Sequence, residues 1–362
     1  MHQFYINDSI RAVDAKFEAQ KIAFAPVAFQ AARTLRDAGI LEYISKSRET
    51  GATIAETASA LKLSEYGVGV LLEMGLGMQL VKLLSLEGES RFILGKVGFF
   101  MLEDDMTRAN MDFTHDVCYN GSFFLKESIL KGKPEGLKVF GDWKTIYEGL
   151  SRLPEQVKES WFKFDHFYSD VAFPDALPIV YARKKRKLFD IGGNTAKWAI
   201  ASCRFDPDVH VTIIDLPGQV AMAKQNIGRE SLSDRIDAIG VDVLSPDSVF
   251  PSGADAVWMS QFLDCFSLDQ IEAIAAKLFR VVDHNCDVYV LEPFWDKQRF
   301  EAASYSLQAT SLYFTCMANG NSKMYRFQEL NDAVCAAGFV LQEAHHNLGA
   351  NAYSLLCFRK KK

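Results

Sequence analysis

The amino-acid sequence predicts an α/β protein with a C-terminal doubly wound sheet, an N-terminal, mostly α-helical region and a helical linker. Two observations lead to this fold class. From about residue 183, short apolar strands alternate with helical segments, which is typical of a mostly parallel sheet covered on both faces. Over the first hundred residues, apolar side chains recur at helical spacing. Because 362 residues exceed one ordinary core, we expect three parts, at residues 1–103, 104–182 and 183–362.

The composition is that of an ordinary globular protein. The chain is 49% hydrophobic and 24% charged, and its net charge of −6 disfavours nucleic acid and anionic membranes as partners. No apolar run approaches the roughly 20 residues of a membrane span, and the polar, acidic N-terminus is unlike a signal peptide. Seven scattered cysteines contain no CxxC motif, so we expect reduced thiols and a cytoplasmic protein.

The first part reads as two helices followed by a hairpin, which is a winged-helix pattern. The first helix opens with a capping box of Thr53 and Glu56, the second spans Ser64 to Met78, and the hairpin is expected within residues 83–102. A helix that reads DNA needs basic side chains, but the second helix contains two glutamates and no lysine or arginine. Its apolar surface favours a protein partner, and we expect a homodimer.

The linker, residues 104–182, is expected to be helical and is rich in aromatic residues. Two interpretations remain open: these side chains pack between the domains, or they form the wall and lid of a substrate pocket.

The third part repeats the order strand, turn, helix. Pro217 suits the first turn of one helix and Ser267 caps another, while the closing pair of strands predicts an antiparallel edge. Strands are expected at 187–193, 209–215, 235–243, 254–262 and 286–294, and helices at 195–205, 216–228, 267–282 and from 327.

A glycine-rich turn follows the first of these strands, where Asp190 precedes Gly192 and Gly193. It lacks the GKS or GKT of a Walker loop, and it lacks the GxGxxG of a dinucleotide site. Such a turn brings the backbone close to a ligand beyond the carboxyl ends of the strands. Asp215 ends the next strand, as suits an acceptor for ribose hydroxyls, and Asp242 follows the third strand, as suits an adenine amino group. Together they fit an adenosine-bearing ligand without a pyrophosphate.

Four segments follow one another along the third part of the chain: IGGNTAKWA, IIDLPGQVAMA, GVDVLSPDSVFPSGADAVWMSQFLDCFSLDQ and LEPF. In this order and spacing they resemble the S-adenosylmethionine-dependent O-methyltransferases of the plant and bacterial small-molecule type, which include caffeate, hydroxyindole and polyketide enzymes. The resemblance covers nearly the whole chain. It implies a Rossmann-like class I methyltransferase sheet, a winged-helix dimerisation domain, S-adenosyl-L-methionine as cofactor and a small-molecule acceptor.

By the family pattern, the glycines approach the amino-acid end of the cofactor, Asp215 holds the ribose, and Asp242 with Val243 holds the adenine. Ser260 falls where the family usually has a lysine near the cofactor. The cofactor-binding candidates are Asp190, Gly192, Gly193, Asp215, Leu216, Asp242, Val243 and Ser260.

The chain departs from the family pattern at two places. The usual GGGTG loop reads GGNTA, with Asn194 and Ala196 in place of glycines, and asparagine tolerates left-handed backbone geometry. In the LHDW motif the general-base histidine is replaced by Asp264. The family glutamate thought to orient the base falls close to Met324, whereas Glu292 matches a family acid.

Asp264 is the first catalytic candidate, with Glu292 and His166 as the others. A phenol has a pKa near 10 and a free aspartate near 3.9, so burial would have to raise the pKa of Asp264 by a few units to make it a useful base. Alternatively the acceptor is already acidic, or Asp264 merely precedes a helix N-terminus. His166 would be a substitute base. His345 and His346 lack a third ligand, so no metal site is expected.

Three classes of function stay open at this point. The first is a dimeric methyltransferase acting on oxygen of a small aromatic or acidic acceptor, with nitrogen and carbon acceptors undecided. The second is a ligand-sensing winged-helix regulator, and the third is a catalytically altered relative that keeps the cofactor pocket.

Overall fold

The computed structural model describes residues 5–86 and 89–361. It comprises two compact units that meet in the chain between Thr114 and His115. The first unit is mainly helical and the second contains a seven-stranded mixed sheet, so the predicted α/β class is confirmed. The finer division at residues 103 and 182 stays a prediction.

The first unit consists of helices around one small hairpin. Its elements are α1 (Ala12–Ala23), α2 (Ala25–Asp37), α3 (Ile40–Lys46), α4 (Ile54–Leu61), α5 (Glu65–Gly77), β1 (Val81–Leu86), β2 (Glu89–Leu94), α6 (Lys96–Glu103) and α7 (Asp105–Phe113). The predicted capping box of Thr53 and Glu56 opens α4, and the Ser64 hydroxyl caps α5. The antiparallel hairpin is shorter than expected from the sequence, because residues 96–103 continue as α6.

The second unit begins with helices that lead to the sheet. They are α8 (Leu125–Lys131), α9 (Ile146–Gly149), α10 (Glu155–Ser169) and α11 (Phe173–Tyr181). Among the described residues, no helix is long and apolar enough to cross a membrane.

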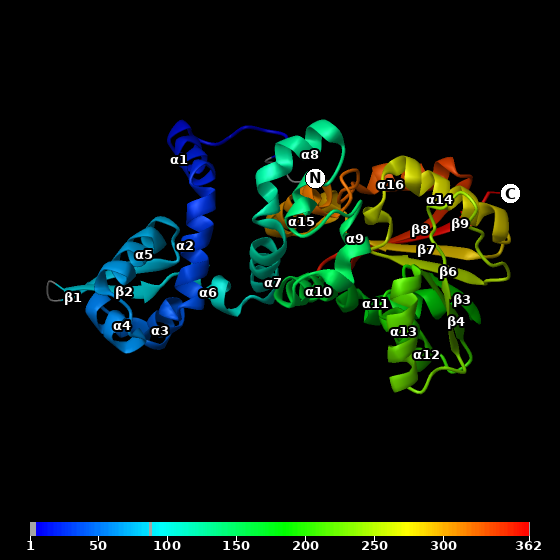
Figure 1. Cartoon of the computed structure of the whole chain (residues 1–362), viewed down its shortest axis with the longest axis horizontal. Helices are drawn as coiled ribbons and strands as arrows, with labels where there is room; N and C mark the ends of the chain where they lie inside the picture. Colours follow the sequence, from blue (N-terminus) through cyan, green and yellow to red (C-terminus); the bar gives the residue numbers. More distant parts are fainter. Residues whose placement is uncertain (1–4, 87–88, 362) are drawn as a thin grey trace. The chain divides into compact units, whose positions relative to one another are not determined.

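The sheet has the strand order β5-β4-β3-β6-β7-β9-β8. Its strands are β3 (Lys187–Ile191), β4 (His210–Asp215), β5 (Ile236–Gly240), β6 (Ala256–Ser260), β7 (Asp287–Glu292), β8 (Phe339–Leu348) and β9 (Tyr353–Lys360). β3 to β7 pair in parallel, while β9 pairs antiparallel with both of its neighbours, β7 and β8. The closing pair therefore lies at one edge, as predicted, with β9 inside the sheet and β8 outermost (Figure 1).

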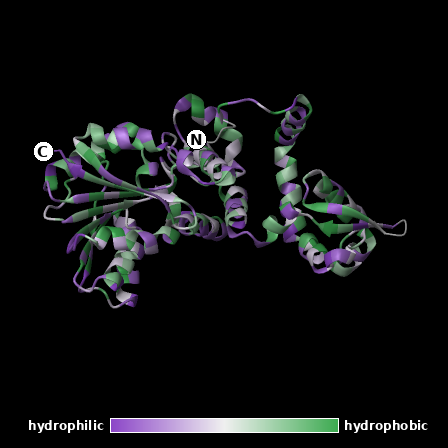
Figure 2. Cartoon of the chain, turned by 180° about the vertical axis from the view of Figure 1, so that it is seen from behind, coloured by the Kyte–Doolittle hydropathy of each residue, from purple (hydrophilic) through white to green (hydrophobic). Residues whose placement is uncertain are grey.

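Helices cover both faces of the sheet. One face packs against α11, α12 (Lys197–Phe205) and α13 (Pro217–Arg229), and the other against α14 (Leu268–Val281) and α16 (Phe327–Ala336) (Figure 1). Each layer encloses its own buried apolar cluster, because successive strand residues point to opposite faces. The covering helices carry both hydrophobic and hydrophilic residues (Figure 2). This arrangement leaves the carboxyl ends of β3, β4, β6 and β7 along one edge, where the loops that follow them meet.

Candidate active site

The two glycines after β3 occupy positions where an added Cβ would clash with neighbouring side chains. Gly192 has a φ of +77°, and a Cβ there would lie 2.3 Å from Cδ2 of Phe262. A Cβ on Gly193 would lie 2.8 Å from the Ile213 side chain and 2.9 Å from Oδ2 of Asp190. The loop is therefore packed tightly on the sheet and presents bare backbone at its carboxyl edge.

Asn194 and Ala196, the departures from the family loop, both adopt left-handed backbone, with φ of 45° and 70°. The turn therefore survives the two substitutions, although left-handed alanine carries a steric cost. The Asn194 N–H donates to Oδ2 of Asp215 at 2.8 Å, which ties the loop to the end of β4. Ala196 then precedes the first turn of α12.

Asp215 and Asp242 lie at the ends of neighbouring strands. Oδ1 of Asp215 accepts from the Leu216 N–H at 2.7 Å, and burial raises the pKa of this carboxyl. Asp215 is paired in register with Gly240, the last residue of β5, so Asp242 follows just beyond it. Asp242 is exposed and accepts from the Leu244 N–H at 2.9 Å, while Val243 is buried.

Several buried side-chain oxygens at this edge have no hydrogen-bond partner among the described residues. Buried polar atoms are rarely left unpaired, so the edge is suited to a polar ligand. Burial, and then the charge of Asp215, raise the pKa of Asp190 to about 8. The unpaired atoms are Oδ2 of Asp190, Oδ1 of Asn194, Oγ of Ser260, Oε1 of Gln261 and Oε2 of Glu292. Of these, Gln261 was missed by the sequence reasoning; only its place between Ser260 and the altered motif signals it.

Asp264 lies in a short 3-10 helix, Leu263–Cys265, that follows β6. Its side chain is only 4% exposed, and burial raises its pKa to about 7. The Cys265 Sγ–H lies 3.5 Å from Oδ1 of Asp264. The next helix, α14, is capped by Ser267 and Gln270. Asp264 is thus a buried acid whose pKa is raised above that of a free aspartate by burial.

Glu292, at the end of β7, holds the segment that carries Asp264. Its Oε1 accepts from the N–H groups of Phe262 at 3.1 Å and Leu263 at 2.9 Å. Burial, and then the charge of Asp264, raise the pKa of Glu292 well above its usual range. The two acids form a buried pair at adjacent strand ends.

A third acid, Asp165 of α10, was not singled out from the sequence; its side chain is 28% exposed. Burial, and then the charges of Asp264 and Asp170, raise its pKa to about 7, opposed by Lys197. Nδ2 of Asn194 lies 3.4 Å from Oδ2 of Asp165, so α10 also meets the glycine loop. The available signal was an acid within the aromatic run KFDHFY.

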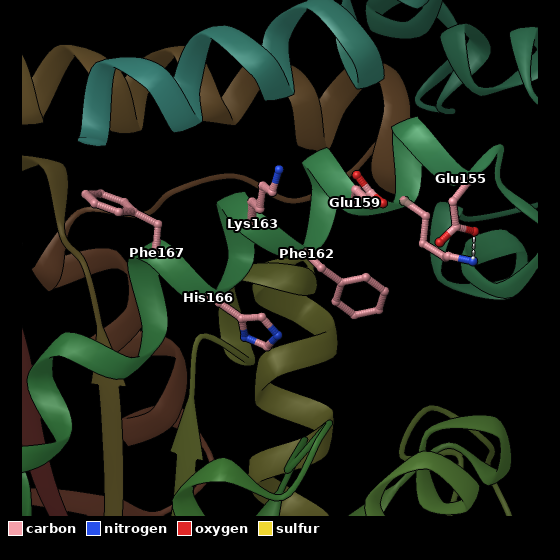
Figure 3. Close-up of a pocket in the computed structure, with 7 residues that line it drawn as sticks. Glu155, Glu159, Phe162, Lys163, His166 and Phe167 are labelled. Atoms are coloured by element: carbon pink, nitrogen blue, oxygen red, sulfur yellow. Dashed lines mark ion pairs between the residues drawn. The ribbon is translucent and has the colours of Figure 1, made fainter. Parts of the chain in front are cut away.

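His166, the next residue on α10, lies in surroundings different from those of Asp165. Its ring stacks on Phe162 with centroids 6.0 Å apart, and both project from the same side of the helix (Figure 3). Burial and Lys197 lower its pKa. Among the described residues it has an ion-pair contact with Asp165 at 3.9 Å and none with Asp264. The residues around it line a surface hollow of about 530 Å³: Glu155, Lys158, Glu159, Phe162, Lys163, His166 and Phe167.

Within the described part of the chain, no group of three or more histidine, cysteine, aspartate or glutamate side chains is placed to hold a metal ion. The groups available for binding and catalysis at this edge are therefore buried carboxyl groups, unpaired side-chain oxygens and a tight backbone turn.

Two family models match the chain. Residues 16–92 match the Dimerisation2-like domain, and residues 124–340 match the O-methyltransferase domain. The second match covers more than half of the 362 residues.

Curated and solved relatives agree with these matches. The chain is 25% identical over 151 residues to a 3-hydroxy-5-methyl-1-naphthoate 3-O-methyltransferase of Streptomyces sahachiroi, covering 42% of this chain and 43% of the relative. The aligned segments span 43% to 62% of the curated relatives' lengths.

Among solved structures, the apo S-adenosylmethionine-dependent methyltransferase SibL is similar with a TM-score of 0.70 at 21% identity, covering 94% of this chain and 98% of that one. The O-methyltransferase NcsB1 from neocarzinostatin biosynthesis, in complex with S-adenosylmethionine and 2-hydroxy-5-methyl naphthoic acid, has a TM-score of 0.66 at 18% identity, covering 93% and 96%. These two likenesses confirm the fold over nearly the whole chain.

Proposed function

This chain belongs to the O-methyltransferase family, and on that premise we propose that it transfers a methyl group from S-adenosyl-L-methionine to an oxygen of a small aromatic acceptor. The observation that carries the proposal is the convergence, at one sheet edge, of a bare glycine turn, Asp215 and the buried pair Asp264 and Glu292. The cofactor supplies an electrophilic methyl group when bound.

The residues at the edge fit such a cofactor. Gly192 and Gly193 form the tight turn after β3, at the edge where such sheets bind their ligand, and Asp215 at the end of β4 is the acceptor for ribose hydroxyls. Asp242 and Val243 stand one strand further, as the proposed adenine neighbours, beside Leu216. The unpaired oxygens of Asp190 and Ser260 supply further hydrogen-bond partners for a polar ligand.

Asp264 is the proposed general base. A pKa of about 7 lies closer to that of a phenol than the ordinary aspartate value does, so the buried carboxylate accepts the acceptor's proton with a smaller energetic deficit. Glu292 acts through it, as a positioning residue, because its hydrogen bonds to two backbone N–H groups fix the segment before Asp264. His166 remains the second candidate base, and its ion-pair contact is with Asp165, at 3.9 Å.

A homodimer, built by a winged-helix-like N-terminal unit, is the proposed assembly. The match to a Dimerisation2-like domain supports it. So does a set of exposed apolar side chains on and between α1 and α2, which an isolated unit would leave in water: Val13, Phe17, Ile22, Phe24 and Val27. The seven free cysteines suit the proposed reducing, cytoplasmic compartment.

Calorimetry and mass spectrometry test the function together. The protein should bind S-adenosylhomocysteine and not NAD, and a panel of hydroxylated aromatic acceptors should gain one methyl group when S-adenosylmethionine is supplied. Absence of binding to both adenosyl compounds would refute the proposal.

A further inference from the structure

The backbone around Asp264 is fixed by side chains from outside its own segment. The Cys265 carbonyl accepts from Nδ2 of Asn319 at 2.7 Å, and the Phe266 carbonyl accepts from the Tyr325 hydroxyl at 2.7 Å. The glutamate at the end of β7 holds the two N–H groups that precede this stretch. All of these hydrogen bonds end on the backbone, and none of them reaches the Asp264 carboxyl group itself.

Two side-chain hydrogen bonds in series lead to that carboxyl group. The Tyr147 hydroxyl donates to Sγ of Cys265 at 3.1 Å, and the Cys265 thiol donates to Oδ1 of Asp264 at 3.5 Å. Within the described part of the chain, Cys265 is the one side chain hydrogen-bonded to this carboxyl group. A thiol has a single hydrogen, so accepting from the tyrosine leaves that hydrogen free for the carboxylate. We call Tyr147, Cys265 and Asp264 the hydrogen-bond triad.

The tyrosine of the triad is held by the packing of α9, the short helix that carries it. Ile146, just before it, is fully buried. Gly149, two residues after it, lies against the Trp143 ring, where an added Cβ would be 2.2 Å from Cε3. The helix is therefore anchored before and after Tyr147, which fixes the position of the hydroxyl.

Both donors keep their protons over the pH range in which Asp264 ionises. Burial, and then the charge of Asp264, raise the pKa of Cys265 well above its usual range. Burial, and then the charge of Cys265, raise the pKa of Tyr147 well above its usual range. A hydrogen bond donated to a carboxylate favours its charged form, so the thiol opposes the effect of burial on the pKa of Asp264.

Other titratable groups act on Asp264 from four further parts of the fold. They are Glu292 of β7, Asp165 of α10, Tyr325 before α16 and Tyr353 of β9. Among the residues that the structure describes, none of these four side chains is hydrogen-bonded to the carboxyl group of Asp264. The thiol is therefore the direct side-chain contact through which this carboxyl group is oriented.

We propose that Cys265 and Tyr147 are positioning residues for Asp264: the tyrosine hydroxyl directs the thiol, and the thiol orients the carboxyl group and favours its ionised form. The inference rests on the proposed function, because it concerns the carboxyl group that acts there as the general base. Both residues act through Asp264 and need no contact with the acceptor.

Infrared titration of the free, full-length protein tests the triad without turnover. The C=O stretching band of the protonated Asp264 carboxyl group is the band that Asp264→Asn lacks, and the pH at half its height is the titration midpoint. Cys265→Ala should raise the midpoint by about 0.5–1 pH unit, which corresponds to the loss of one ordinary hydrogen bond to the charged form. Cys265→Ser keeps a donor at this place, so its midpoint should not rise.

Tyr147→Phe removes the first donor of the triad and should raise the midpoint by less than Cys265→Ala does. In the double variant Tyr147→Phe/Cys265→Ala the midpoint should equal that of Cys265→Ala, because the tyrosine acts through the thiol. Tyr325→Phe is the matched control. It removes a hydroxyl hydrogen bond to the same segment, at the Phe266 carbonyl, and should leave the midpoint unchanged.

Two results would overturn the inference: an unchanged midpoint in Cys265→Ala, or a Tyr147→Phe shift that persists in full in the double variant. If Cys265→Ala fails to fold, the Tyr147→Phe midpoint decides alone, and its equality with the wild type overturns the inference. The proposed function fails with a different signature. The rising limb of the pH–rate profile should move with the infrared midpoint, and a limb that stays while the midpoint moves would refute Asp264 as the base but support the triad.

Discussion

Replacing Asp264 by asparagine separates general-base catalysis from a structural role for this residue. The substitution keeps the shape of a side chain that is 4% exposed but removes its ability to accept a proton. General-base catalysis typically contributes a factor of about 10²–10⁴, so kcat should fall by that factor, and affinity for S-adenosylhomocysteine should stay almost unchanged. Steady-state kinetics and calorimetry measure the two quantities.

The pH–rate profile gives the sharper readout. Because burial raises the pKa of Asp264 to about 7, the basic form accumulates as pH rises through 7, and kcat of the wild-type enzyme should rise over the same range. In Asp264→Asn this limb should vanish. Asp269→Asn, an exposed acid in the first turn of α14, is the matched control and should keep both rate and profile.

Two outcomes would contradict the general-base assignment. If the acceptor is already ionised, the variant should lose little activity, and rates should follow the pKa of each acceptor across a substrate series. If Asp264 only stabilises the loop before α14, stability should drop by about 1 kcal/mol without a specific change in the pH profile. A wild-type profile in Asp264→Asn would refute the reasoning outright.

Three further outcomes are expected. Asp215→Ala should weaken S-adenosylhomocysteine binding by about 2–4 kcal/mol in calorimetry, because two charge-assisted hydrogen bonds are lost; unchanged affinity would refute the ribose assignment. Gly192→Ala should destabilise the protein by about 1–3 kcal/mol, because the added Cβ would lie 2.3 Å from the Phe262 ring. Gly228→Ala is the control and should not destabilise it, because no atom lies within 4 Å of the added Cβ. Equal melting temperatures of the two variants would contradict this prediction. The pKa of Asp190, about 8, lies above the value of about 4 in the unfolded chain, so the folded state keeps this proton to higher pH. The free energy of unfolding should therefore fall by up to about 1.4 kcal/mol per pH unit between about pH 4 and 8. Thermal melts of Asp190→Asn should show a shallower fall with pH, and a slope identical to that of the wild type would exclude the assignment.

Much of the fold could be predicted from the sequence because its signals are local. The alternation of apolar strands with helices, the caps at Thr53 and Ser267, and Pro217 in the first turn of α13 each depend on a few neighbouring residues. The insertion of β9 between β7 and β8 depends on pairing between distant segments, and no short motif specifies it.

The site was predictable only where a strand end coincides with a motif. Asp215, Asp264 and Glu292 follow that rule, and the structure brings the last two together. Asp165 does not follow it, because its position depends on how α10 packs over the sheet edge.

The position of β9 has a consequence for the order of events during synthesis. Ribosomes release β7 and β8 before β9, yet β7 has its second sheet partner only in β9, with Glu292 opposite Ser354 (Figure 1). Until β9 emerges, the nascent chain holds an apolar strand with a free edge, which is a template for aggregation. Chaperone demand should therefore be greatest after β7 has emerged and before β9 has paired with it, and the active-site acid Glu292 on β7 acquires its surroundings on that side only then.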